Sequence, residues 1–398
     1  CKYQVIYDSR KSVGFELGAW SVWFNTVVQL PRETEYLHVV CAVNKTTLAD
    51  EFMAMAPTRM SIAGRIKQQI RTPKVSPGTY QSKLNFIIVT IEGLSSIDFV
   101  RSMSYTHEFI FNDLKSFELK YHAQLGASVP DNIIPLLTGK SENEMVMDRK
   151  LLDKDVPRLN ALLWDDFERE GYLTLSTEDD PVEGMIPHLM KWFDSMPTHY
   201  STLPLIRALH SANVLTESPR PCLRDEASRQ NFHLGYLRKF FKQFPDQPLF
   251  SYLHFSGLNL TDAYETTVLD NDLRHFLEDF LELGYLNNSV LVLTSGDVHQ
   301  TEPVGSADVL KTPFAFLSLP HWLADDYPDA VSSLRQNSQT LTTNYDLYET
   351  IVDLLHLNDP GSRYAPGRTV GQSLLRGIHP GRDCKSLLVP AEFCVSAC

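Results

Sequence analysis

The sequence predicts an α/β protein, folded as a three-layer α/β/α sandwich around a mainly parallel sheet, with a small β-rich segment at its N-terminus. From residue 84 onward, short continuous apolar runs alternate with longer segments of helical periodicity. This pattern is typical of buried parallel strands that are connected by helices. Before residue 80, short runs rich in aromatic and β-branched residues are separated by turns, which favours strands.

The expected elements follow in order along the chain. Strands are predicted at 2–7 and 36–41, and a polar stretch with Pro73, Pro77 and Gly78 then acts as a linker. This linker divides the chain into a β-rich segment, 1–80, and a larger domain, 81–398. Within the larger domain we expect strands at 86–91, 172–175, 249–255, 290–294 and 313–317. Helices are expected at 96–115, 159–170, 264–283 and 345–357, because apolar residues recur there with helical spacing.

Composition excludes several classes of protein. The chain has 398 residues, of which 43% are hydrophobic and 21% charged, so a disordered chain, a coiled coil or a collagen-like repeat is not expected. The net charge of -13 argues against a nucleic-acid partner, because phosphate backbones require a basic surface. No apolar run approaches the ~20 residues of a membrane span, and we expect no transmembrane segment in this chain.

Cysteines and glycosylation sequons indicate the compartment. Six cysteines lie at Cys1, Cys41, Cys222, Cys384, Cys394 and Cys398, and none forms a Cys-x-x-Cys motif. Proximity favours pairing Cys1 with Cys41, and Cys222 with one of the three C-terminal cysteines. An even number of cysteines suits an oxidising environment; the alternative is a cytosolic protein with unpaired buried thiols.

Three sequons begin at Asn44, Asn259 and Asn287, and they favour a secreted or luminal protein that carries N-glycans. The chain starts at Cys1 without a methionine. We therefore expect a secreted protein or a luminal ectodomain, with any signal peptide or membrane anchor upstream of this sequence.

Polar residues follow the predicted strands, at the edge where α/β sheets bind ligands. Glu92 follows the strand at 86–91, and Asp297 and His299 follow the strand at 290–294. Ser128 precedes a predicted helix, where a hydroxyl is well placed to meet an anionic group. Carboxylates around such a position could hold a divalent metal.

These segments, taken in order, resemble the alkaline phosphatase and sulfatase superfamily, and more closely an extracellular animal branch of it known only as a domain of unknown function. The resemblance covers about 84–398 and is carried by IIVTIEGLSSIDFVRSM, SVPDNIIPLLTGKSENE, NYDLYETIVDLLHL and the long helix followed by GYLNNSVLVLTSGD. It implies an alkaline phosphatase-like fold. It also implies phosphate or sulfate ester chemistry with two divalent metals, commonly zinc.

The residues that the resemblance assigns to the metals are degenerate here. Glu92 takes the place of the first-strand Asp, and Ser128 takes the place of the nucleophile. The Asp-His-Gly turn of the superfamily aligns with Gly296-Asp297-Val298, and a one-residue shift recovers Asp297 but leaves His299 two places later. In the loop after 249–255, Leu260 stands at a His position. We therefore expect that at least two or three metal ligands have been lost.

We therefore expect a catalytically inactive pseudoenzyme with no bound cofactor, which acts as a binding or structural subunit with an extracellular protein partner. A glycan on Asn259 would lie at the mouth of the site. The alternative is an active hydrolase of phosphoesters, phosphodiesters or sulfate esters, with two zinc ions. In that case Glu92, Asp297 and His299 would bind the metals and Ser128 would be the nucleophile.

Each site residue also has a structural interpretation. Glu92 could accept hydrogen bonds from loop amides, and Ser128 could be an ordinary helix cap. Asp297 and His299 could lie in a solvent-facing loop, and the run 178–180 is expected to be a solvated acidic turn. His254, which lies within an apolar strand, is expected to be a core histidine.

Overall fold

The computed structural model describes residues 1–9, 14–62, 64, 83–151, 162–190, 196–212, 228–256, 263–298, 312–357, 370–379 and 381–395. The predicted linker residues Pro73, Pro77 and Gly78 lie outside these ranges. No described helix is long and apolar enough to cross a bilayer.

The central sheet has seven strands and is mainly parallel, as predicted. Its strands are β5 (Asn85–Ile91), β6 (Phe117–Glu118), β8 (Leu173–Glu178), β9 (Tyr200–Ser201), β10 (Leu249–Phe255), β11 (Ser289–Ser295) and β12 (Ala315–Ser318). They lie in the order β6-β12-β11-β5-β10-β8-β9. The strands from β11 to β9 pair in parallel, whereas β12 and β6 form an antiparallel edge.

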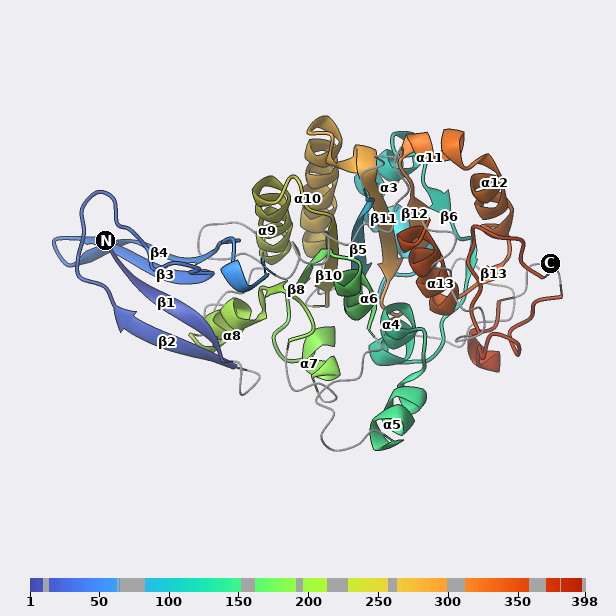
Figure 1. Ribbon diagram of the computed structural model, residues 1–398, viewed down its shortest axis with the longest axis horizontal. Coiled ribbons are helices and arrows are strands. Elements are labelled where there is room, and N and C mark those ends of the chain that lie inside the picture. Colours follow the sequence, from blue (N-terminus) through green and yellow to red (C-terminus); the bar gives the residue numbers. More distant parts are fainter. Residues whose placement is uncertain are drawn as a thin grey trace.

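Helices cover both faces of this sheet (Figure 1). Successive side chains of β5 alternate between two apolar clusters, so that Ile87 and Val89 face one layer and Phe86 and Ile88 face the other. The first layer contains α2 (Ser96–Ser102), α3 (Ser104–Asn112), α8 (Leu203–Ser211), α9 (Arg229–Gln243) and α10 (Ala263–Glu282). The second contains α4 (Val129–Thr138), α5 (Glu142–Leu151), α6 (Leu163–Arg169), α7 (Met185–Leu189), α11 (His321–Asp326), α12 (Pro328–Asn337) and α13 (Asn344–Leu355). This three-layer arrangement confirms the predicted fold class.

The N-terminal residues form a separate four-stranded antiparallel sheet at one end of the molecule (Figure 1). Its order is β2 (Gly14–Trp20), β1 (Lys2–Ser9), β3 (Tyr36–Val43), β4 (Thr46–Ala54). Ile6, Tyr36 and Ala54 are buried in the first apolar cluster, and the Tyr36 hydroxyl donates a hydrogen bond to the carbonyl of Ser201. The sheet is thus anchored to the larger part of the chain through shared core. Whether 1–80 and 81–398 are separate domains stays a prediction.

Most predicted elements are present, with one clear correction. The single helix expected over 96–115 is two helices, α2 and α3, which meet at Met103. Met103 is the C-cap of α2 and has a non-helical backbone conformation, and its side chain is fully buried. The helical spacing of apolar residues continues across this break, which is why the sequence pattern did not reveal it.

Smaller elements complete the chain. They are a parallel pair formed by β7 (Tyr121–His122) and β13 (Leu341–Thr342), and the 3₁₀ turns η1 (Tyr285–Asn288) and η3 (Ala391–Phe393). Two disulfides are described, Cys1–Cys41 and Cys384–Cys394. The first confirms the expected pair. Because Cys384 and Cys394 pair with each other, only Cys398 of the C-terminal three remains for Cys222, and both lie outside the described residues.

A buried ion pair attaches the C-terminal residues to α13. Asp346 is fully buried and accepts hydrogen bonds from the Arg382 guanidinium and from the backbone N–H groups of Thr343 and Gln372, both at 2.8 Å. Burial raises the pKa of Asp346, and the charge of Arg382 opposes that rise. Arg376 forms a comparable pair with Asp353, but its side chain is 43% exposed.

These two pairs yield a matched test. Arg382→Leu leaves the Asp346 carboxylate buried without its cation, so we expect the free energy of unfolding to fall by about 3 kcal/mol. Arg376→Leu breaks a largely solvated pair and should cost under about 1 kcal/mol. Urea denaturation of both variants measures the difference, and equal losses would contradict this account of the C-terminal attachment.

Candidate functional site

The carboxyl ends of four parallel strands bring acidic residues and one histidine together. Glu92 follows β5, Asp297 lies just beyond β11, and Glu178 ends β8. In the sheet register, Glu178 of β8 and Thr90 of β5 both lie opposite His254 of β10. This is the edge where open α/β sheets place their ligand sites, and it is where the sequence predicted the site.

Glu92 and His254 form the central contact of this edge. His254 is completely buried, and its Nε2 lies 2.6 Å from Oε1 of Glu92, whose side chain is 17% exposed. On the other side of the ring, Nδ1 lies 2.5 Å from the Thr90 hydroxyl and 3.1 Å from the Tyr252 hydroxyl. Both ring nitrogens therefore have oxygen partners, as expected of a core histidine. Of the two interpretations of Glu92, as a metal ligand or as an acceptor of hydrogen bonds from loop amides, the structural one is modified: its carboxylate contacts an imidazole.

The surroundings of His254 favour its charged form. Burial alone would lower the pKa of His254, but the hydrogen bond and charge of Glu92, together with the charges of Glu178 and Asp179, raise it above its usual value. An imidazolium can donate from Nε2 to Glu92 and from Nδ1 to Thr90. The Thr90 hydroxyl can then donate to the Leu253 carbonyl at 3.3 Å. All the hydrogen-bonding groups of the protonated ring are thereby satisfied.

Glu178, in contrast to His254, favours its uncharged form. Its side chain is fully buried, Oε1 accepts a hydrogen bond from the N–H of Ile186 at 2.6 Å, and Oε2 has no hydrogen-bond partner among the described residues. Burial raises the pKa of Glu178 to about 8, although the charge of His254 opposes the rise; Asp179 and Glu92 add to it. Glu178 is therefore expected to hold its proton near neutral pH.

Asp179 is also buried, but both of its carboxylate oxygens accept hydrogen bonds from other parts of the protein. Its Oδ2 accepts from the Gln230 side chain at 2.9 Å, and its Oδ1 accepts from the N–H of Ser256 at 2.8 Å. The expectation that 178–180 is a solvated turn is wrong for Glu178 and Asp179, which are each 1% exposed. The prediction failed because β8 extends to residue 178 rather than ending at 175, which draws both side chains into the sheet edge.

Asp297 connects the loops after β11 and β5. It is 4% exposed, and its Oδ1 accepts from the N–H of Gly93 at 2.8 Å. The alternative of a solvent-facing loop is therefore wrong for Asp297. Gly296 donates its N–H to the carbonyl of Ile91, and a Cβ at this glycine would lie 3.0 Å from Cγ of Glu92. A side chain at 296 would therefore have to displace the Glu92 side chain by a few tenths of an ångström. His299 lies outside the described residues.

Ser128 is an exposed N-cap of α4. Its hydroxyl lies 2.6 Å from Oδ2 of Asp131, and that carboxylate accepts from the N–H of Ser128, which completes a capping box. The side chain of Asn132 donates to the Ser128 carbonyl. Among the described residues, the hydrogen bonds of Ser128 therefore stay within its own helix and do not reach Glu92 or Asp297.

The described residues do not fit a two-metal set. No group of three His, Cys, Asp or Glu side chains in the described ranges is arranged to hold a metal ion. Glu92 shares its carboxylate with the imidazole of His254, and Asp297 uses one oxygen for the N–H of Gly93. We therefore derive no step through a metal. What this edge does hold is a buried acid, Glu178, beside a carboxylate–imidazolium pair.

The sequons occupy different settings. Asn44 and Lys45 both have positive φ in the two-residue turn between β3 and β4, and Asn44 is exposed at the tip of that hairpin. Asn287 is exposed in η1. Asn259 lies outside the described residues, so its expected position at the mouth of the site stays a prediction.

Glu178 generates a pH-dependent prediction. Because its pKa rises from 4.5 in the unfolded chain to about 8 in the fold, the unfolded chain releases this proton first. The free energy of unfolding should then fall as the pH rises from about 5 to 8. Glu178→Gln removes this loss, so the variant should gain stability over the native protein across that range, by up to a few kcal/mol.

Thermal and urea denaturation at closely spaced pH values measure this gain. The exposed carboxylate of Glu183 supplies a control, because Glu183→Gln should shift stability little and by the same amount at each pH. A Glu178→Gln variant that is less stable than the native protein at pH 8 would show that the ionised carboxylate is needed there.

Comparisons with known proteins give the family. Among solved structures, the chain is similar to a protein in the alkaline phosphatase superfamily from Vibrio parahaemolyticus, at 11% identity and a TM-score of 0.47, covering 75% of this chain and 76% of that one. It is also similar to the lipoteichoic acid synthase LtaP from Listeria monocytogenes, at 11% identity and a TM-score of 0.48, with coverages of 79% and 81%. The phosphonate monoester hydrolase of Agrobacterium radiobacter matches at 12% identity and a TM-score of 0.47, with coverages of 76% and 79%.

A search of curated proteins finds no match. The sequence profile of the protein family of unknown function DUF229 matches residues 1–398. The expected membership in a domain-of-unknown-function branch is therefore confirmed at the level of the family. Over its whole length, the chain belongs to the DUF229 family.

Proposed function

We propose that this chain is an extracellular pseudoenzyme, which keeps a hydrolase-type fold of the alkaline phosphatase and sulfatase kind and serves as a binding or structural subunit for an extracellular protein partner. The observation that carries the proposal is the buried contact between Glu92 and His254. The carboxylate that would bind a metal already has the imidazole of His254 as a partner at 2.6 Å. A divalent cation bound to Glu92 would repel the protonated form of that imidazole, which the surrounding carboxylates favour.

Two further features support the loss of catalysis. Position 296, where the resemblance expects an acidic ligand, is a glycine that packs against Glu92. A longer side chain there would push Glu92 away from His254. The hydroxyl of Ser128 is used in a capping box with Asp131, which is a sufficient structural reason for a serine at that position.

Disulfides and sequons support the extracellular location. Cys1–Cys41 and Cys384–Cys394 each close a loop near one end of the sequence, and stable disulfides are typical of oxidising compartments. Asn44 and Asn287 are exposed and accessible to glycans. An upstream signal or membrane anchor would complete this location.

One observation favours the alternative of an active hydrolase. A buried carboxyl whose pKa is raised to about 8 is suited to general acid catalysis, and Glu178 lies beside the carboxylate–imidazolium pair. Under this alternative, Ser128 is the nucleophile, and Glu92, Asp297 and His299 hold two zinc ions. The metal site would then involve residues outside the described ranges.

Metal analysis and a turnover assay separate the two. We expect the protein purified from a secreting host to contain less than one equivalent of zinc. It should also show no turnover of nitrophenyl phosphate, phosphodiester or sulfate above background. Two tightly held zinc ions per chain would overturn the proposal.

Two cap serines make the assay specific. Ser141 forms the same kind of cap with Glu144, with contacts of 2.7–2.8 Å. Ser128→Ala and Ser141→Ala should therefore each cost about 1 kcal/mol of stability without any change in turnover. Turnover that disappears in Ser128→Ala and persists in Ser141→Ala would establish the hydrolase instead.

A further inference from the structure

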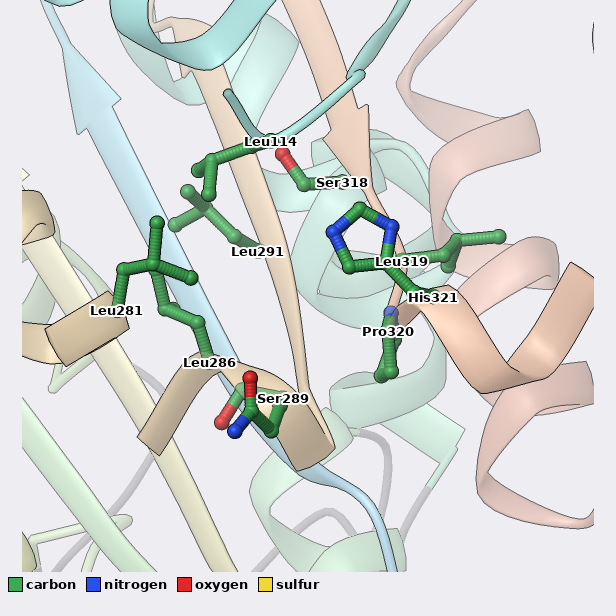
Figure 2. Close-up of a pocket in the computed structure, with 10 residues that line it drawn as sticks. Leu114, Leu281, Leu286, Ser289, Leu291, Ser318, Leu319, Pro320 and His321 are labelled. Carbon is green, nitrogen blue, oxygen red and sulfur yellow. The ribbon is translucent and has the colours of Figure 1, made fainter. Parts of the chain in front are cut away.

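An apolar hollow lies at the amino end of β11, at the opposite end of that strand from Asp297. Its enclosed space is only about 20 Å³, and the hollow is otherwise open to solvent. Figure 2 shows Leu281, Leu286, Leu114 and Leu291 on one side, with Ser318 and His321 on the other. The hollow is distinct from the candidate site, and the proposed function leaves it unused.

Asn287 lines the same hollow and begins the sequon Asn287-Asn288-Ser289. It lies in η1, where its N–H donates to the carbonyl of Gly284 at 3.2 Å. Gly284 has a φ of 76°, and a Cβ at this glycine would lie 3.3 Å from Nδ2 of Asn287. Glycine at 284 therefore accommodates the left-handed turn and also keeps the space around the nitrogen that would carry a glycan.

We propose that Asn287 carries an N-linked glycan whose first N-acetylglucosamine packs over the open mouth of this hollow and covers the leucines at its rim. The proposal rests on the extracellular location proposed above. In the modification, a bond forms between Nδ2 of Asn287 and C1 of the sugar. The bond from C1 to the diphosphate of a lipid-linked oligosaccharide breaks, the amide loses one proton, and the lipid diphosphate leaves with the electron pair.

The chemistry of the hollow suits this occupant. The sugar ring and its acetamido methyl group present C–H surfaces, which can pack on Leu281 and Leu286 and remove apolar area from water. Its hydroxyl and amide groups can face solvent, the Ser318 hydroxyl or the exposed His321 ring. A free ligand would have to lose translational freedom to bind here, whereas a sugar attached to Asn287 is already held at the rim.

Asn44 is the matched control within the same chain. It begins a sequon at the tip of the hairpin between β3 and β4, where both turn residues are exposed. A glycan there extends from a projecting turn rather than from the wall of a hollow. The two sites should therefore differ in how strongly their first sugar affects stability.

The experiment uses full-length protein from a secreting host that makes high-mannose glycans. Glycopeptide mass spectrometry establishes the occupancy of Asn44 and Asn287. One sample is then trimmed by an endoglycosidase that leaves a single N-acetylglucosamine on each site, and a second by an amidase that removes the whole glycan. The melting temperature is measured for the native sequence, Asn44→Gln and Asn287→Gln in both forms.

We expect the single-sugar form to melt about 1–3 °C above the sugar-free form. This gap should persist in Asn44→Gln and disappear in Asn287→Gln. The amidase leaves an aspartate at position 287 of the native sequence, whereas the Asn287→Gln variant has none there. The two should melt at the same temperature, which would exclude an effect of that aspartate. Under native conditions, the amidase should release the glycan of Asn287 several-fold more slowly than that of Asn44.

Other outcomes overturn the inference. A gap that persists in Asn287→Gln, or equal release rates at both sites, would show that the first sugar does not pack over the hollow. Glycan on Asn44 with none on Asn287 would defeat this inference alone. Absence of glycan from both sites in a secreting host would contradict the extracellular proposal as well.

Discussion

An imidazole buried between a carboxylate and a threonine hydroxyl is the constraint on which the carboxyl edge of this sheet depends. His254 has no contact with solvent, and its two ring nitrogens meet Glu92 at 2.6 Å and the Thr90 hydroxyl at 2.5 Å instead of water. Burying a charge without such partners costs several kcal/mol. The positions of the β5 and β10 ends are therefore linked by electrostatics as well as by backbone hydrogen bonds.

That pair also determines how the neighbouring carboxyls behave. Asp179 receives hydrogen bonds from Gln230 and from the backbone of Ser256, which stabilise its ionised form. Within the described part of the chain, Glu178 receives only the N–H of Ile186, and the negative charges of Asp179 and Glu92 also act on it. One imidazolium cannot neutralise three carboxylates in a low-dielectric region. The least solvated of them, Glu178, is therefore the one that keeps its proton.

The sequence predicted the layers of this fold better than it predicted the site. Continuous apolar runs identified β5, β10 and β11, because each of these strands is buried on both faces. The sequence did not predict β2, β6 or β9, because these strands are short or exposed and lack continuous apolar runs. The burial of Glu178 was missed because it depends on where β8 ends and on its register with β10. Both depend on the tertiary structure. From the sequence alone, three acidic residues after a strand indicate a turn.

The assignment of site residues stays a prediction, and the partners of these residues could not be inferred from the sequence. A serine followed three residues later by an aspartate fits both a helix cap and a nucleophile at a helix start, and only the contacts of Ser128 distinguish a cap that is already engaged. The partnership of Glu92 with His254 joins residues 162 positions apart. A histidine inside an apolar strand carries no local signal of which carboxylate it will meet.

Under the proposed function, the same pair explains how a fold of this kind stays intact without cations. The two apolar layers that hold the sheet together are built from side chains other than Glu92, Glu178, His254 and Asp297, so loss of a metal would not remove core packing. It would, however, leave acidic side chains close together without a counter-charge, which is unfavourable in a partly buried site. An internal imidazolium supplies that positive charge from the chain itself. Under that proposal, the raised pKa of His254 favours this positive charge, and Gly296 lies close to Glu92 where Glu92 contacts the ring.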